Sequence, residues 1–331
     1  MPDLQNYQKI LVTGAAGSLA QLTLSLLLKE CPRLKLLGVD SRPLRRAQNP
    51  RLSLYQMSYT RGQFESLFRD HHFDAVLHLG RLSHSPSGPL SLAQRLDLNL
   101  MGTNKILDLC LKNKISKLVV LSTYHVYGAY NDNPIYLSEE APLRASISHP
   151  ELRDVVEMDQ ICTSWMWKHR ERIETLVLRP CSIVGPQMAN TMTRYLKTPY
   201  MPLPIDFNPS LQLIHEMDMA RILVEALRRL PSGVFNVAPP ETITLREAKK
   251  IVNQPVVPTP LSLLFPAGPL MERLWGLPRY LLDYLKFPCI LSQEALLAQW
   301  PELIFLNSPR QTLEQLHRPI PSLGPRAGQS L

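Results

Sequence analysis

Short apolar runs and helical patterns alternate along the first half of the chain. Four runs have the length of buried strands and lie at 9–13, 34–39, 74–79 and 117–122. Stretches with helical spacing of apolar residues separate them, at 18–30, 61–70 and 91–113. Buried strands that alternate with helices are typical of a parallel sheet covered on both faces. The pattern therefore predicts an α/β fold with a doubly wound parallel sheet.

The alternation continues beyond these elements. A helix is predicted at 151–172, followed by a strand from Thr175 to Leu178. An amphipathic helix from Asp218 to Leu230 then precedes a strand from Val234 to Val237. We expect this later helix and strand to return to the same sheet.

The character of the chain changes near residue 180. The sequence holds 30 prolines, which crowd its second half, and proline interrupts both helices and central strands. We therefore expect a nucleotide-binding domain over 1–180, completed by 213–238. A smaller, irregular substrate lobe is expected over 181–212 and 239–318. The tail, 319–331, is expected to be disordered.

A glycine-rich turn follows the first apolar run and opens the first helix. Gly14 comes directly after the run, and Gly17 precedes the helix that extends from Leu19 to Glu30. Gly14 can adopt backbone conformations that a Cβ disfavours. Gly17 lets a pyrophosphate approach the N–H groups at the helix start, where the helix dipole favours negative charge. Asp40 ends the second run and can accept both ribose hydroxyls of NAD, so the spacing predicts a Rossmann-type dinucleotide site.

The acidic residue also bears on the choice of cofactor. The Asp40 carboxylate repels the additional phosphate of NADP, so NAD is the expected cofactor and NADP is less favoured. Arg42 stands two residues later and would soften this preference.

Composition excludes several classes of protein. The net charge is +8 and is not gathered into a long basic block, so nucleic-acid binding is not expected. Residues 1–9 are polar and no apolar run reaches the ~18 residues of a membrane span. The five cysteines, at 31, 110, 162, 181 and 289, show no metal-ligand spacing. We expect reduced thiols, no metal site and a cytoplasmic location.

Segment 256–291 is apolar, aromatic and broken by proline. One interpretation is a lobe that covers a substrate pocket. The alternative is a peripheral membrane contact, which requires a large exposed apolar face.

Further motifs, in order along the chain, resemble those of extended short-chain dehydrogenases/reductases, the NAD-dependent epimerase/dehydratase group. Besides the turn at Gly14–Ala20, they are His78–Arg81, Asn99–Thr103, Leu121–Gly128, Leu178–Pro186 and Ile214–Ala220. The resemblance spans roughly residues 8 to 240. It implies an NAD-binding protein with a small-molecule substrate. It also implies a homodimer paired through helices 91–113 and 151–172, where Trp165 and Trp167 would serve the interface or the core.

The glycine turn and the resemblance together indicate the site residues. Those expected to bind the cofactor are Gly14, Ala16, Gly17, Ser18, Leu19, Asp40, Ser41, Arg42, Met57, Ser58, Leu79, Gly80, Arg81, Asn99, Ser122, Pro180 and Ile183. Thr123 stands at the catalytic Ser/Thr position that the resemblance implies. Tyr124, His125 and His149 are the nearby candidates for proton transfer.

One expected pair is missing. In the family, a tyrosine four residues before a lysine transfers the proton from the helix after this motif. In this chain the tyrosine would fall near 151–152 and the lysine near 155–156. No lysine occurs between Lys117 and Lys168, however, and the residue four positions before Lys168 is Ser164. An active enzyme would need another proton donor, with Arg153 as a possible substitute for the lysine.

Three other departures argue against an ordinary sugar-nucleotide substrate. At strand three, the segment Tyr55–Ser58 lacks an aspartate, Leu211-Gln212 replaces an arginine, and Ser182 replaces an asparagine.

The sequence leaves two functions open. The first is an NAD-dependent oxidoreductase, epimerase or dehydratase with atypical proton transfer on a sugar-like or apolar substrate. The second is an inactive NAD-binding sensor or scaffold.

Overall fold

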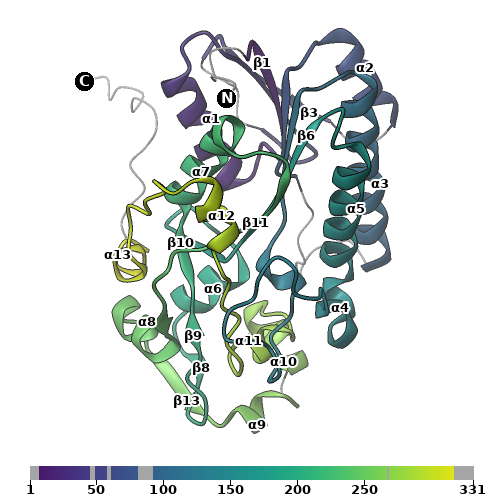
Figure 1. Ribbon diagram of the computed structural model, residues 1–331. Helices are drawn as coiled ribbons and strands as arrows, with labels where there is room; N and C mark the ends of the chain where they lie inside the picture. The colour runs from purple at the N-terminus through teal and green to yellow at the C-terminus, as the bar shows by residue number, and fades with distance from the viewer. Residues whose placement is uncertain (1–6, 45–48, 58–60, 81–91, 267, 317–331) are drawn as a thin grey trace, which may run out of the picture.

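Parallel strands form one large sheet at the centre of the molecule (Figure 1). The computed structural model describes residues 7–44, 49–57, 61–80, 92–266 and 268–316. In spatial order the strands are β11 (Gly233–Val237), β6 (Glu174–Pro180), β5 (Lys117–Leu121), β4 (Ala75–His78), β1 (Lys9–Thr13), β2 (Lys35–Asp40) and β3 (Leu52–Gln56). The order 3-2-1-4-5-6, extended by β11, confirms the predicted doubly wound Rossmann-type sheet.

Helices cover both faces of this sheet (Figure 1). One face carries α1 (Ser18–Glu30) and α7 (Glu216–Arg229), and the other carries α2 (Arg61–Asp70), α3 (Leu92–Lys112) and α5 (Arg153–His169). Successive strand residues point to opposite faces. Ile10 and Val12 therefore join the core beneath α1 and α7, while Leu11 joins the core beneath α3 and α5.

The C-terminal part is smaller and irregular, as predicted. It contains three two-stranded sheets: β7 (Ser182–Val184) with β10 (Leu213–His215), β8 (Met201–Pro204) with β13 (Val256–Thr259), and β9 (Ser210–Leu211) with β12 (Ile243–Thr244). Its helices are α6 (Thr191–Lys197), α8 (Leu245–Val252), α9 (Leu261–Leu264), α10 (Gly268–Trp275), α11 (Leu281–Tyr284), α12 (Glu294–Gln299) and α13 (Pro309–Glu314). A third buried cluster, including Tyr195 and Leu282, holds these pieces together.

Short helical turns and caps shift several predicted boundaries. The turns are η2 (Tyr124–Val126), α4 (Ala145–Ser148) and η3 (Pro150–Leu152). Helix α5 begins at Arg153 rather than at 151, because η3 takes up the residues after Pro150 in a tighter turn. Helix α7 begins at Glu216, two residues early, because the His215 ring accepts the Met217 N–H and caps it.

The third strand is Leu52–Gln56, so Tyr55 and Gln56 are its last residues and Met57 follows it. Strand β11 pairs with β6, so the later strand returns to the main sheet as expected. The partition into two domains stays a prediction. The tail 319–331 lies outside the described residues. All five cysteines are free and buried. Within the described ranges, no helix is long and apolar enough to cross a membrane.

Candidate functional site

The predicted cofactor residues gather at one edge of the main sheet. Gly14 follows β1, Asp40 ends β2, Leu79 follows β4, Ser122 follows β5 and Pro180 ends β6. Because these strands are parallel, their carboxyl ends meet at the same edge, where open α/β sheets bind their ligands.

The glycine turn is closed against the neighbouring strand. Gly14 has φ of 72°, and a Cβ there would lie 2.5 Å from the Cα of Gly80. Gly17 donates its N–H to the Gly14 carbonyl at 2.9 Å and caps α1. Ser18 then starts α1 and donates its hydroxyl to the Gln187 carbonyl at 2.7 Å. Only glycine fits at Gly14, so the turn brings bare backbone to the start of the helix.

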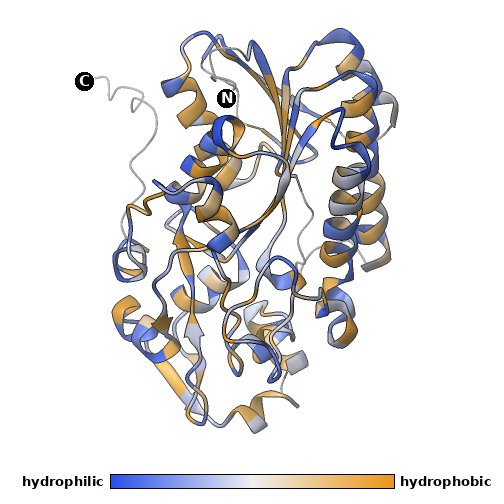
Figure 2. Cartoon of the chain, viewed as in Figure 1, coloured by the Kyte–Doolittle hydropathy of each residue, from blue (hydrophilic) through white to orange (hydrophobic). Residues whose placement is uncertain are grey.

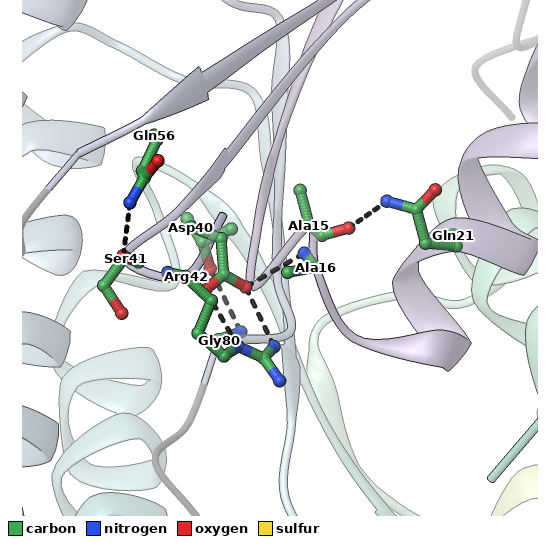
Figure 3. Close-up of polar contacts among 9 residues, drawn as sticks. Ala15, Ala16, Gln21, Asp40, Ser41, Arg42, Gln56 and Gly80 are labelled. Carbon is green, nitrogen blue, oxygen red and sulfur yellow. Dashed lines mark hydrogen bonds and ion pairs between the residues drawn. The ribbon is translucent and has the colours of Figure 1, made fainter. Parts of the chain in front are cut away.

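Asp40 is engaged by its own neighbours (Figure 3). Its Oδ2 accepts from the Ala16 N–H at 2.9 Å and from Nη2 of Arg42 at 3.0 Å. Its Oδ1 accepts from the backbone N–H of Arg42 at 2.8 Å and from Nε of Arg42 at 3.1 Å. Burial alone would raise the pKa of Asp40, but the hydrogen bonds and charge of Arg42 outweigh it and lower the pKa. A ribose that binds Asp40 must therefore displace or share the Arg42 guanidinium.

The residues around Asp40 are fixed through their backbones. The Met57 N–H donates to the Asp40 carbonyl at 2.9 Å, and the Gln56 side chain donates to the Ser41 carbonyl at 3.3 Å (Figure 3). These contacts hold β3 beside the end of β2. Ser58 and Arg81, which the sequence assigns to the cofactor site, lie outside the described residues.

A buried histidine lies behind the glycine turn. His78 Nδ1 is 2.7 Å from the Thr13 hydroxyl, and His78 Nε2 is 3.1 Å from the Thr103 hydroxyl. Burial lowers the pKa of His78 to about 4, so the ring is neutral at pH 7. Thr13 also accepts the Gly80 N–H at 3.2 Å. The sequence included His78 in a motif but gave it no role. The signal that could have indicated this role is its place at the end of β4, level with Thr13 at the end of the neighbouring strand β1.

The predicted catalytic residues lie together at the start of η2. The Thr123 hydroxyl is 2.9 Å from Nδ1 of His125. The His125 ring lies among Tyr124, Tyr280 and Tyr284, with centroid distances of 4.2, 5.4 and 5.0 Å. Thr123 and His125 thus form a hydroxyl–imidazole pair that can relay a proton.

Tyr124 is less suited to proton transfer. Its hydroxyl accepts from Ser182 at 2.8 Å, and burial raises its pKa far above the ordinary tyrosine value. A phenolate at this place is therefore strongly disfavoured near neutral pH.

Two buried carboxylates on α5 are hydrogen-bonded to neighbouring elements. Asn99 and Arg95 donate to Oδ2 of Asp154 at 2.8 and 3.1 Å. Ser122 donates to Oδ2 of Asp159 at 2.5 Å. Asn99 and Ser122, both predicted to bind the cofactor, thus also position α3 and β5 against α5.

Arg179 completes this network from β6. Its Nε and Nη2 donate to the two oxygens of Asp159 at 3.0 and 2.7 Å, and its Nη1 donates to the Tyr127 hydroxyl at 2.9 Å. The pairing ties β6, α5 and η2 together. The sequence motif contained Arg179 but did not reveal this partner.

A charged histidine bridges the two parts of the chain. His149 Nε2 lies 2.6 Å from Asp283 of α11, and its Nδ1 lies 3.6 Å from Glu151. Burial opposes the charge, but the hydrogen bonds to Asp283 and Glu151 prevail and raise the pKa of His149 to about 9. At neutral pH this histidine is an ion-pair partner rather than a free base.

A small pocket adjoins Tyr124. Its lining residues are uncharged and come from both parts of the chain: Tyr124, Ser182, Met192, Ser210, Leu211, Gln212, Tyr284 and Cys289. The Gln212 amide donates to the carbonyls of Pro239 and Leu291 and accepts the Leu291 N–H, so it is held by backbone. Ile183 of β7 follows Ser182 and pairs with Ile214. The described residues contain no cluster of three potential metal ligands.

Comparison with known proteins identifies the sequence class. The model of the NAD dependent epimerase/dehydratase family matches residues 10–238. An uncharacterized protein, Rv0501, of Mycobacterium tuberculosis (strain ATCC 25618 / H37Rv) is 28% identical over 195 residues, covering 59% of this chain and 51% of that protein. The uncharacterized protein Mb0513 of Mycobacterium bovis gives the same match. The aligned region thus spans about half the length of these curated relatives.

Solved structures share the fold at low sequence identity. UDP-glucose 4-epimerase of Thermotoga maritima has a TM-score of 0.72 at 18% identity, covering 93% of this chain and 97% of that one. The dTDP-glucose 4,6-dehydratase of Bacillus anthracis, in complex with NAD, has a TM-score of 0.71 at 16% identity, covering 93% and 95%. UDP-glucose 4-epimerase of Thermus thermophilus, also with NAD, has a TM-score of 0.69 at 20% identity, covering 93% and 98%.

Proposed function

The chain belongs to the NAD-dependent epimerase/dehydratase family, and on this premise we propose that it binds NAD and acts on a small uncharged molecule. The reaction is an oxidation–reduction, an epimerisation or a dehydration with an atypical proton donor. The observation that supports this proposal most strongly is the glycine turn. Gly14 packs directly against Gly80, and Asp40 ends the adjacent strand.

The described residues fit a dinucleotide. Backbone without side chains faces the start of α1, whose dipole favours a pyrophosphate. Asp40 reaches the same place and suits the ribose of NAD better than that of NADP. The residues proposed to hold NAD are Gly14, Ala16, Gly17, Ser18, Leu19, Asp40, Ser41, Met57, Leu79, Gly80, Asn99, Ser122, Pro180 and Ile183. Arg42 lies in the same site, where its guanidinium competes with the ribose for Asp40. When bound, NAD would supply a hydride acceptor.

Thr123 and His125 are the proposed proton-handling pair. The Thr123 hydroxyl would hydrogen-bond the substrate oxygen, and His125 Nδ1, at 2.9 Å, would take or return the proton through that hydroxyl. Tyr280 and Tyr284 cover the ring from α11 and its flank, which limits its contact with water. Imidazole exchanges protons near neutral pH, so it can replace a tyrosine in this role.

The pocket has a volume of about 10 Å³, the room of one water molecule, so only a small uncharged end of a substrate would enter it. None of its lining side chains is ionised at neutral pH, and Gln212 is tied to backbone carbonyls. A phosphorylated ligand would bury its charge there without a cation, which is costly. We therefore propose an alcohol or ketone with apolar surface in preference to a sugar nucleotide.

A second candidate is an inactive NAD-binding sensor or scaffold. The observation that favours it is the face of α5 towards the sheet, where Val155 and Val156 are buried and the family pair would stand. Such a protein would bind NAD and lack turnover.

Titration with NADH, followed by nicotinamide fluorescence, tests the proposal. We expect saturable binding that Asp40→Ala abolishes and Thr123→Val leaves intact. Absence of binding in the unaltered protein would refute an NAD-dependent function of either kind. Turnover of a ketone panel that Thr123→Val removes would favour the enzyme, and cellular function without Thr123 would favour the sensor.

We also propose a homodimer paired through α3 and α5. Met101 on α3 and Trp167 on α5 are 64% and 60% exposed, although large apolar residues are usually covered. Light scattering should show a dimer that Trp167→Glu converts to a monomer, and an unaltered monomer would contradict this assignment.

A further inference from the structure

Three leucines are exposed on two consecutive helices of the C-terminal part. Leu263 of α9 is 61% exposed, and Leu270 and Leu274 of α10 are 55% and 61% exposed. Leu270 and Leu274 are four residues apart and so share one face of α10. Met271, which is next to them around the helix, is buried. The exposed residues of α10 thus include two leucines together with Arg273.

Two further exposed apolar residues lie near the start of α9, one just after β8 and one on β13. Ile205 is 52% exposed, and its N–H donates to the Thr259 carbonyl just before α9. Val257 of β13 is 46% exposed. Helix α9 and strand β13 lie together at the lower end of the molecule, where Figure 2 shows hydrophobic residues on both. We call Ile205, Val257, Leu263, Leu270 and Leu274 the leucine patch.

Three exposed arginines lie on or next to α10. Arg273 is exposed on α10 between Leu270 and Leu274. Arg279 is exposed, and its Cγ lies 3.5 Å from where a Cβ on Gly268 would stand, so its apolar stem lies along the start of α10. Exposed Arg194 donates to the Gly276 carbonyl at 2.9 Å, just after α10. Long cationic side chains that border an apolar face can keep their charge in a polar layer while their stems stay in an apolar one.

Acidic groups near α10 do not balance these cations. Glu272 of α10 and Asp206, which accepts the Leu261 N–H at the start of α9, are two carboxylates against the three arginines. Asp283 of α11 is neutralised by His149. The face therefore presents apolar surface together with excess positive charge. That is the combination by which interfacial helices bind membranes that contain anionic lipid.

We propose that the leucine patch docks on an anionic membrane surface. Leucine is under-represented among the energetically dominant residues of protein–protein interfaces, whereas leucine with flanking arginine is typical of interfacial helices. Docking would place Leu263, Leu270 and Leu274 at the acyl boundary, and Arg273 and Arg279 among the lipid phosphates. The inference rests on the surface alone and stands apart from the proposed reaction.

Co-sedimentation with vesicles tests this proposal on the full chain. The vesicles contain phosphatidylcholine alone or an equal mixture with phosphatidylglycerol. We expect binding to the mixed vesicles, weakened at least about tenfold by Leu270→Glu with Leu274→Glu, because each leucine loses its burial in lipid. Arg273→Gln should weaken it about fivefold, since one basic residue near such a surface contributes about 1 kcal/mol.

The matched control carries the same charge change elsewhere. Ile135 and Ile304 are 81% and 68% exposed outside the leucine patch, and Ile135→Glu with Ile304→Glu should sediment like the unaltered protein. Failure of the unaltered protein to bind mixed vesicles would overturn the proposal, as would full binding by the leucine variant. Conversion of a dimer to a monomer by the leucine variant, without vesicles, would assign the face to a second copy instead.

Discussion

Replacing Arg42 by alanine should strengthen the binding of NADH. Two of the four hydrogen bonds that the Asp40 carboxylate accepts come from the Arg42 guanidinium, through Nε and Nη2. The other two come from the backbone N–H groups of Ala16 and Arg42 and survive the substitution. Arg42→Ala therefore frees two acceptor positions, the number that a ribose diol needs, without altering the turn.

The size of the effect follows from the exposure of the pair. The Arg42 side chain is 59% exposed, whereas that of Asp40 is 5% exposed. Solvent screening reduces such an ion pair to about 0.2–1 kcal/mol. If NADH must displace the guanidinium, its removal should lower the Kd of NADH by between about 1.4-fold and fivefold. NADPH should respond in the opposite direction, because the variant lacks a cation for the additional phosphate.

Paired fluorescence titrations of NADH and NADPH measure both constants. Arg69→Ala is the matched control, since Arg69 is an exposed arginine beside an aspartate on α2. The reasoning fails if Arg42→Ala weakens NADH binding at low salt while Arg69→Ala does not. That result would mean that Arg42 itself holds the cofactor rather than competing for Asp40.

Three further changes test the rest of the site. Gly14→Ala should lower stability by about 1–3 kcal/mol and prevent NADH binding, because its Cβ meets neighbouring backbone at a positive φ; thermal unfolding checks this against Gly62→Ala, where a Cβ meets nothing. His125→Gln should lower kcat about 10²–10⁴-fold with NADH affinity unchanged; equal turnover would remove His125 from the proposed reaction. The raised pKa of His149 stabilises the fold fully below its unfolded pKa, and this contribution is lost as the pH rises through about 9. Urea unfolding between pH 6 and 10 should therefore show a loss of about 1 kcal/mol after screening, which His149→Gln should abolish.

Local signals in the sequence predict much of the fold and the position of the cofactor site. The main strands and helices follow from hydrophobic periodicity, and the glycine turn follows from a backbone constraint that Gly14 alone satisfies. Residues that act through distant partners were not predictable in this way. His78 meets Thr13 and Thr103, which stand 65 and 25 positions away in the chain. A pattern along one sequence does not show which polar groups face one another across a sheet.

The same limit applies to the rotamer of Arg42. Its place two residues after Asp40 was visible, and a softened preference for NAD followed from charge alone. That the guanidinium folds back onto the carboxylate depends on Asp40 being buried at the strand end while Arg42 remains exposed. The first effect to measure is therefore the competition between Arg42 and the ribose for Asp40, rather than the attraction of Arg42 for the additional phosphate of NADP.

The buried carboxylates on α5 bear most directly on the choice between enzyme and sensor. Asp154 and Asp159 lie close to the place of the family's tyrosine and lysine, and each is paired with a buried arginine. Removing one partner of such a pair leaves an uncompensated buried charge, at a cost of about 3–5 kcal/mol, so both carboxylates serve to hold α5 against its neighbours. We therefore assign proton transfer in an enzyme to groups outside these ion pairs. Thr123 and His125 meet that requirement, with hydroxyl and imidazole already 2.9 Å apart. Retention of NADH binding with loss of turnover in His125→Gln therefore supports the enzyme with this proton-handling pair, whereas NADH binding without turnover in the unaltered protein decides for the sensor.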